Sequence, residues 1–176
     1  MSNLRLLNTT TVGSSVSTVN VEDVFTSDFD IYKIIVPTMV TVGVSATDIG
    51  LRFINSAGGV DSTSSYDYAN RGLRAYTTYA DQRSASSVYI QKLGQADQQP
   101  EGAGFVAYVF NPFQSDRYTF MIHQNSFSFG SGKGGGKGIG VHQDLSSQTG
   151  FQLVAISSTR PFDTSTIRTY GIRVDT

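Results

Sequence analysis

The chain has 176 residues, enough for one domain that buries about two thirds of its unfolded surface in a single core. Charged residues make up 15% of it, and it holds 11 Phe and 9 Tyr, a balance that argues against intrinsic disorder. The net charge of −1 offers no basic field for nucleic acid or an anionic membrane. The absence of cysteine excludes disulfides, thiolate metal sites and cysteine nucleophiles.

The first eighteen residues contain one short apolar cluster that a polar tract ends at once. No signal-peptide core forms there, so we expect a cytoplasmically made chain whose residues 1–18 are a flexible or partner-docking segment. Two predicted strands follow, since "STVNVEDVF" alternates and "FDIYKIIV" places Ile31, Lys33 and Ile35 on one face.

Further predicted strands continue to the end of the chain, and helix signals are nearly absent. "GFVAYVF" is apolar on both faces and should be central, whereas "TIRTYGIRV" is typical of a strand nearer an edge. Turn residues separate the strands. About eight to ten short strands therefore predict an all-β fold, an antiparallel β-sandwich or jelly roll formed by residues 1–176 as a single domain.

A glycine-rich stretch interrupts this pattern, with seven glycines and two lysines between Gly130 and Gly140. It fails the phosphate-binding P-loop pattern, and its G-x-G-x-x-G match lacks the following helix that a dinucleotide site needs. Glycine costs a helix roughly 1 kcal/mol relative to alanine. We predict an exposed loop that adapts to a neighbouring subunit or a host-surface ligand, with Lys133 and Lys137 meeting acidic groups there.

Candidate catalytic residues do not assemble into a recognisable site. A Ser-His-Asp relay needs a nucleophile on a tight turn such as G-x-S-x-G, and the sequence contains none. We therefore interpret His123 and His142 as surface or sheet residues. The carboxylates are scattered, and Asp61 and Asp67 do not fit an EF-hand loop, although a loop calcium stays open. We therefore predict no catalytic residue, metal or cofactor. A hydrolase stays an alternative because sequence spacing cannot show a carboxylate pair across a sheet.

The segment "SSYDYANRGLRAYTTYADQ" is rich in tyrosine and arginine, the residue types that dominate recognition hot spots. The alternative is that its aromatic residues pack between the sheets. Together with the two lysines of the glycine-rich stretch, the predicted interaction residues of this segment are Tyr66, Tyr68, Arg71, Arg74, Tyr76 and Tyr79.

Four landmarks occur in order along nearly the whole chain. They are "DFDIYKIIV", "LRFINSAGGVDSTSSYDYANRGLRAY", "GQADQQPEGAGFVAYVFNP" and "TIRTYGIRV". In their order and spacing, the chain resembles the jelly-roll virion proteins common in tailed, often marine, double-stranded DNA bacteriophages.

The resemblance implies a non-enzymatic structural protein at the virion surface, in a tail fibre, another appendage or a tail adaptor. It also implies a homotrimer that contacts other virion proteins and, in a recognition role, a host cell-surface glycan, with no nucleic acid and no membrane insertion. The long glycine-rich insertion and the lack of a long N-terminal docking extension depart from a tail fibre. A head decoration protein and a free carbohydrate-binding module therefore remain alternatives.

Overall fold

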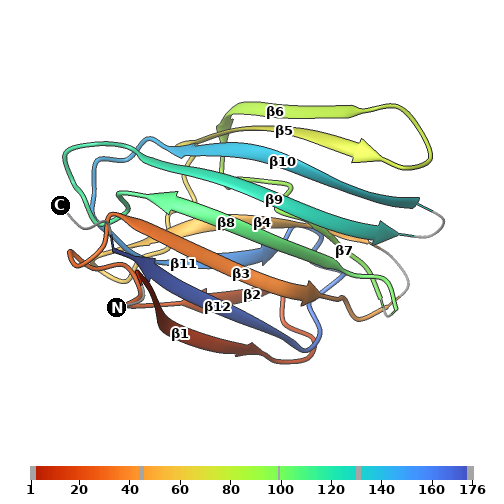
Figure 1. Cartoon of the computed structure of the whole chain (residues 1–176), viewed down its shortest axis with the longest axis horizontal. Helices are drawn as coiled ribbons and strands as arrows, with labels where there is room; N and C mark the ends of the chain where they lie inside the picture. Colours follow the sequence, from red (N-terminus) through yellow and green to blue (C-terminus); the bar gives the residue numbers. More distant parts are fainter. Residues whose placement is uncertain (1–2, 44–45, 99, 130–131, 174–176) are drawn as a thin grey trace.

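The computed structural model describes residues 3–43, 46–98, 100–129 and 132–173, and these form twelve strands in two antiparallel sheets (Figure 1). The eight-stranded sheet contains, in spatial order, β1 (Leu4–Val12), β12 (Ser165–Ile172), β3 (Ile31–Met39), β8 (Ala103–Phe110), β9 (Thr119–Phe129), β10 (Gly132–His142), β5 (Tyr66–Arg74) and β6 (Ala80–Ser87). The four-stranded sheet contains β2 (Thr18–Val21), β11 (Gln148–Ala155), β4 (Thr47–Asn55) and β7 (Gln95–Ala96).

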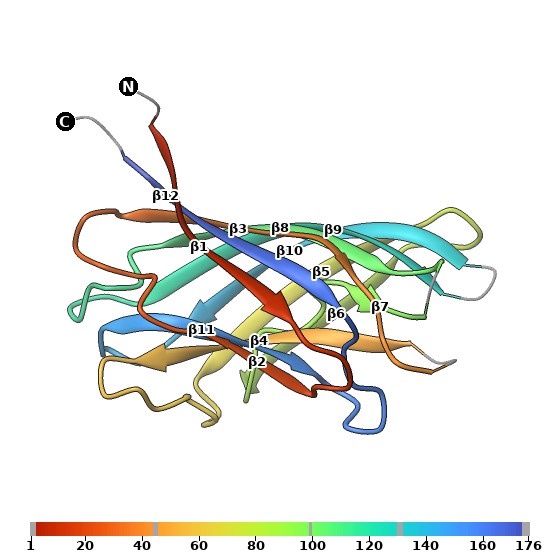
Figure 2. The same cartoon turned by 90° about the horizontal axis from the view of Figure 1, so that it is seen from below.

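The two sheets form a sandwich, seen as two layers in Figure 2. Half of the large sheet, in the order β1-β12-β3-β8, faces the small sheet in the order β2-β11-β4-β7, and the chain crosses between them as in a jelly roll. The antiparallel pairs β5–β6 and β9–β10 extend the large sheet to eight strands. The predicted all-β sandwich is confirmed, with twelve strands in place of eight to ten.

The core lies between the sheets and follows the expected alternation of strand side chains. In β8, for example, Phe105, Ala107 and Val109 are buried, while Val106 and Tyr108 between them are half-buried on the outer side. An aromatic cluster joins the layers, because the ring of Phe25 lies 4.7 Å from Tyr32 in the large sheet and 5.9 Å from Phe151 in the small one. As predicted, β8 is central and β12 lies next to the edge strand β1.

Residues 1–18 were predicted to be a flexible or partner-docking segment, and the flexible alternative is wrong for most of them. Leu4–Val12 forms β1, which pairs along its length with β12. Its run of threonines has the β-branched side chains that suit a pleated strand, and Leu7 packs against the core. The segment is therefore part of the sandwich.

The predicted glycine-rich loop is also wrong, because Gly132–His142 forms β10, paired with β9 on one side and β5 on the other. Residues 130 and 131 lie outside the described residues. Glycine is needed here for space, because neighbouring side chains cross the strand. A Cβ at Gly138 would lie 2.5 Å from Nε2 of His123, and one at Gly140 would lie 2.5 Å from Cδ1 of Ile90.

The described residues contain no helix that is long and apolar enough to cross a membrane.

Candidate functional site

The outer face of the eight-stranded sheet carries rows of side chains that run across its strands. Directly opposed residues on successive strands point the same way, so the strand registers define each row. The first row, here called the apolar row, consists of Leu4, Ile172, Ile31, Phe110, Phe120 and Val141. The next row contains Leu6, Tyr170, Lys33, Tyr108, Ile122 and Ile139.

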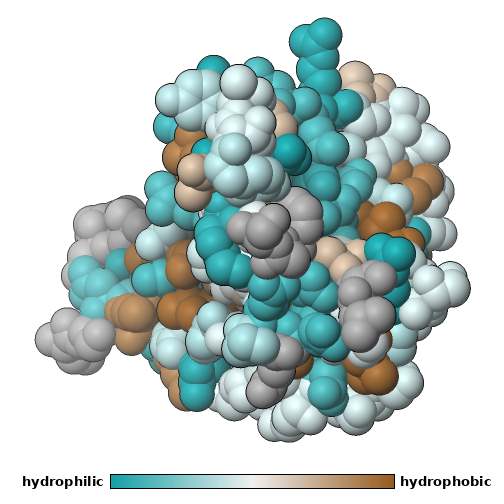
Figure 3. Space-filling view, turned by 90° about the vertical axis from the view of Figure 1, so that its right-hand side faces the viewer, coloured by the Kyte–Doolittle hydropathy of each residue, from teal (hydrophilic) through white to brown (hydrophobic). Residues whose placement is uncertain are grey.

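Several of these apolar side chains are open to solvent. The exposed fraction is 52% for Leu6, 50% for Phe120 and 53% for Ile139. In Figure 3 hydrophobic residues reach the surface between hydrophilic ones, several of them on the left, the side of the eight-stranded sheet. Neighbouring exposed apolar side chains, such as Phe120, Ile122 and Ile139, are typical of a contact site.

Beside the apolar row, the outer face is hollowed into a groove of about 1150 Å³. The groove crosses β3, β8, β9, β10, β5 and β6. Its apolar floor includes Val106, Tyr108, Ile122 and Ile139. The charged residues that line it are Lys33, Arg71, Arg83, Lys137 and Asp81. We call it the basic groove.

Two of the cations lie side by side in the sheet. Lys137 of β10 is directly opposite Arg71 of β5, and Arg71 is opposite Asp81 of β6. The Nε atom of Arg71 lies 3.7 Å from Oδ1 of Asp81, and its guanidinium is 4.8 Å from the ring centre of Tyr79. Asp81 therefore pairs with Arg71, on the side of Arg71 that faces away from Lys137.

Lys33 reaches the groove from its far side. Its ammonium lies 5.6 Å from the ring centre of Tyr108, within the range of a cation–π contact. Within the described part of the chain, Lys33, Arg83 and Lys137 form no ion pair.

Beneath the groove, His123 and Asn70 fill the space that Gly138 leaves open. His123 is 2% exposed, and neither ring nitrogen has a hydrogen-bond partner among the described residues. Burial lowers the pKa of His123 to about 4. His123 is therefore neutral at pH 7 and adds no charge to the groove.

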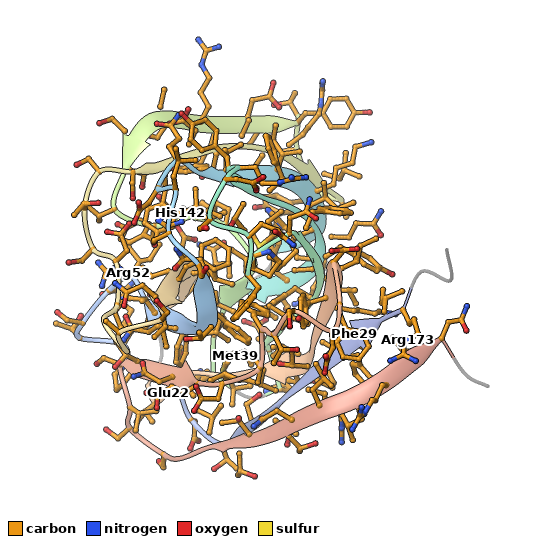
Figure 4. All side chains as sticks on the ribbon, turned by 90° about the vertical axis from the view of Figure 1, so that its left-hand side faces the viewer. Glu22, Phe29, Met39, Arg52, His142 and Arg173 are labelled. Carbon is orange, nitrogen blue, oxygen red and sulfur yellow. The ribbon has the colours of Figure 1, made fainter. Side chains whose placement is uncertain are left out.

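A second polar pair lies inside the sandwich, at the end of β10 (Figure 4). Nε2 of the fully buried His142 is 2.6 Å from Oδ2 of Asp61. The same carboxylate accepts hydrogen bonds from Ser65 at Oδ2 and from Thr63 at Oδ1. Burial raises the pKa of Asp61, but the hydrogen bonds from His142, Ser65 and Thr63 outweigh it and lower the pKa. The imidazole stacks on the ring of Tyr66 at 4.6 Å.

Asp144 completes a group whose potential ligand atoms lie within 4.8 Å of one another, the other members being Asp61 and His142. Both oxygens of Asp61 accept hydrogen bonds within the chain, and Asp144 accepts one from Ser146 at 2.8 Å. These contacts explain the group as a hydrogen-bonded joint between β10 and the loop that precedes β5.

The predicted interaction residues separate into three places. Tyr66 is fully buried and donates to the carbonyl of Asp61 at 3.0 Å, so the alternative of packing between the sheets is correct for it. Tyr68 is half-buried, and its hydroxyl donates to Gln91 at 2.9 Å. Arg71 and Lys137 meet in the basic groove, as described above.

The remaining predicted residues lie towards the other end of the β5–β6 and β9–β10 hairpins. Arg74, Tyr76 and Tyr79 are exposed. Lys133 is also exposed and pairs with Glu101, its Nζ atom 2.9 Å from Oε1. Lys133 therefore lies outside the groove that Lys137 lines.

The sequence reasoning missed Tyr108 and Gln124 as groove residues and left Lys33 and Arg83 without a role. The sequence did mark Lys33 as unusual, because it is a charged residue in an otherwise apolar stretch of β3. Tyr108 and Gln124 gave no signal of their own, because only the register of β8 with β9 brings their rows together.

Comparison of the chain with known protein families, curated proteins and solved structures gives no match.

Proposed function

We propose that this protein is a non-enzymatic structural component of a tailed bacteriophage virion, exposed on the particle as part of a tail fibre, another appendage or a tail adaptor. It acts through protein–protein contacts made by the outer face of the eight-stranded sheet. Other virion proteins and further copies of this chain, as a homotrimer, are its proposed partners.

The landmark segments that resemble virion jelly rolls support this proposal by their position. "DFDIYKIIV" supplies β3, "GFVAYVF" supplies β8 and "TIRTYGIRV" supplies β12. These three strands are neighbours in the sheet, in the order β12-β3-β8. The remaining landmark, "LRFINSAGGVDSTSSYDYANRGLRAY", lies in β4 and β5, so the four landmarks together involve both sheets.

The observation that carries the proposal is the apolar row. Six apolar side chains follow one another across six neighbouring strands, from Leu4 to Val141, on a sheet face that no other element of the described chain covers. Isolated apolar residues on a surface are normal, but a continuous row is typical of an interface. Packing of this row between copies would bury it in a closed oligomer.

The basic groove argues for binding over hydrolysis. Among the described residues that line it, Asp81 is the one carboxylate, and it is engaged with Arg71 at 3.7 Å. A glycosidase needs two carboxyl groups roughly 5 to 9 Å apart across the bond that it cleaves. The groove therefore favours the carbohydrate-binding alternative over a hydrolase.

Light scattering behind a sizing column tests the subunit contact. We expect a mass near three times 19.0 kDa for the wild type. Phe120→Asp should yield smaller species, because a buried charge without a partner is strongly unfavourable at an interface. Leu145→Asp is the matched control, since Leu145 is 55% exposed in the turn before β11 and should leave the mass unchanged. A monomeric wild type would contradict the homotrimer.

Antibody labelling of purified phage particles in the electron microscope tests the location. Label on the tail or an appendage supports the proposal. Label on the capsid instead identifies a head decoration protein, and particles without the chain would overturn the virion assignment.

A further inference from the structure

We propose that the basic groove binds a linear polysaccharide that carries carboxylate groups. The proposal rests on the carbohydrate-binding role that the groove favours above and names the chemical class of the ligand. It concerns the groove from β3 to β6, whereas the subunit contact is assigned to the apolar row.

Charge is the first reason. The groove contains four cationic side chains and one carboxylate, while the chain as a whole has a net charge of −1. The cations are therefore concentrated on one concave surface of a slightly acidic protein. Such a surface raises the local concentration of an anionic ligand and orients its approach.

The arrangement of the cations is the second reason. Lys137 and Arg71 are directly opposed on neighbouring strands, which destabilises a sheet when no anion lies between them. Asp81 relieves this only from the far side of Arg71. A ligand carboxylate above β10 would lie against both cations and would receive charge-assisted hydrogen bonds.

The other groove residues fit a sugar chain. Gln82 and Gln124 line the groove and offer side-chain amides that both donate to and accept from hydroxyl groups. Ile122, Ile139 and Tyr108 form an apolar floor suited to the C–H face of a sugar ring.

A peptide ligand fits less well. Peptides bound to sheets commonly add a strand at an edge, where backbone groups are free. The groove lies on the face of the sheet, and β3, β8, β9, β10 and β5 each have paired strands on both sides. Among the groove strands, β6 alone lies at the edge of the sheet, and a peptide paired with it would lie beside the sheet and not on its face. The groove itself therefore offers side-chain contacts, which suit a hydroxyl-rich and carboxylate-rich polymer.

Binding of defined glycans to the full chain tests the proposal, with polygalacturonate as the carboxylated probe and dextran as the neutral one. We expect polygalacturonate to bind, binding to weaken with added salt, and dextran not to bind. Lys137→Ala and Arg83→Ala should each reduce affinity roughly tenfold, as for the loss of one charge-assisted hydrogen bond. Lys133→Ala removes the same charge outside the groove and should leave affinity unchanged.

The proposal would be overturned by no binding of polygalacturonate, by equal binding of dextran, or by unchanged affinity in both groove variants. Equal binding of poly-glutamate would show recognition of charge alone and would reject a glycan ligand. Light scattering of each variant keeps the two proposals separate, because loss of glycan binding with an unchanged oligomer mass concerns the groove alone.

Discussion

The Nε2 atom of His142 lies 2.6 Å from the Oδ2 atom of Asp61, and this contact ties the end of β10 to the loop that leads into β5. The imidazole is fully buried between aromatic rings, 4.6 Å from Tyr66 and 5.3 Å from Phe53. Tyr66 extends the joint, since its hydroxyl accepts from the backbone N–H of Phe53 at 2.9 Å. One polar cluster thus connects both sheets at one end of the sandwich.

Replacement of Asp61 by alanine should lower the free energy of unfolding by about 2–4 kcal/mol, because it leaves a buried imidazole nitrogen without a partner. Urea denaturation measures the change. Asp67→Ala is the control, since Asp67 accepts one hydrogen bond from Gln143 at the surface and should change stability by less than about 0.5 kcal/mol. Equal effects of the two variants would show that the joint does not stabilise the fold.

Acid should destabilise the protein through His123. Its pKa is about 4 in the folded chain against 6.5 without burial, so the unfolded chain takes up the proton first as the pH falls. The contribution of His123 to the free energy of unfolding is therefore constant above pH 6.5 and falls by about 3 kcal/mol as the pH is lowered towards 4. Asp61 has a lowered pKa, so its contribution is lost only at lower pH, below its ordinary pKa of 3.8.

Urea denaturation at a series of pH values measures how the free energy of unfolding depends on pH, and the His123→Gln variant is the protein with which the wild type is compared. The difference in unfolding free energy between the two proteins should shrink between pH 6.5 and 4. A constant difference across this range would mean that His123 is protonated equally in the folded and unfolded chains.

The glycines of β10 should be intolerant of even one methyl group. Gly138→Ala places a Cβ 2.5 Å from Nε2 of His123 and 2.9 Å from the carbonyl of Ala69, which should cost about 1–3 kcal/mol. Gly13→Ala is the control, because no atom lies within 4 Å of that position. Equal melting temperatures for the two variants would contradict the packing explanation of this strand.

The distribution of apolar residues along the strands was sufficient to predict the sandwich, the central position of β8 and the place of β12 beside an edge. It could not reveal β10, because a glycine-rich segment has no side-chain pattern of its own. The cause lies far away in the sequence, in residues such as Asn70 and Ile90, whose side chains occupy the space on the inner side of the strand.

The site was partly predictable for a related reason. Arg71 and Lys137 were both singled out from composition, yet only the pairing of β5 with β10 places them opposite each other. Tyr66 was singled out by the same rule and is instead in the core, because alternate residues of β5 face opposite sides of the sheet. Composition identifies candidate residue types, and strand register decides which face they reach.

Hydrogen exchange should distinguish a central strand from a loop at the glycine-rich segment. Because β10 pairs with β9 and β5 along Gly134–His142, its amides should exchange about as slowly as those of β8. The turn between β5 and β6 is the internal reference for fast exchange, since its residues 75–79 are exposed. Mass spectrometry of peptides from both segments measures the difference. Exchange of β10 as fast as that of the turn would restore the exposed loop that the sequence alone predicts.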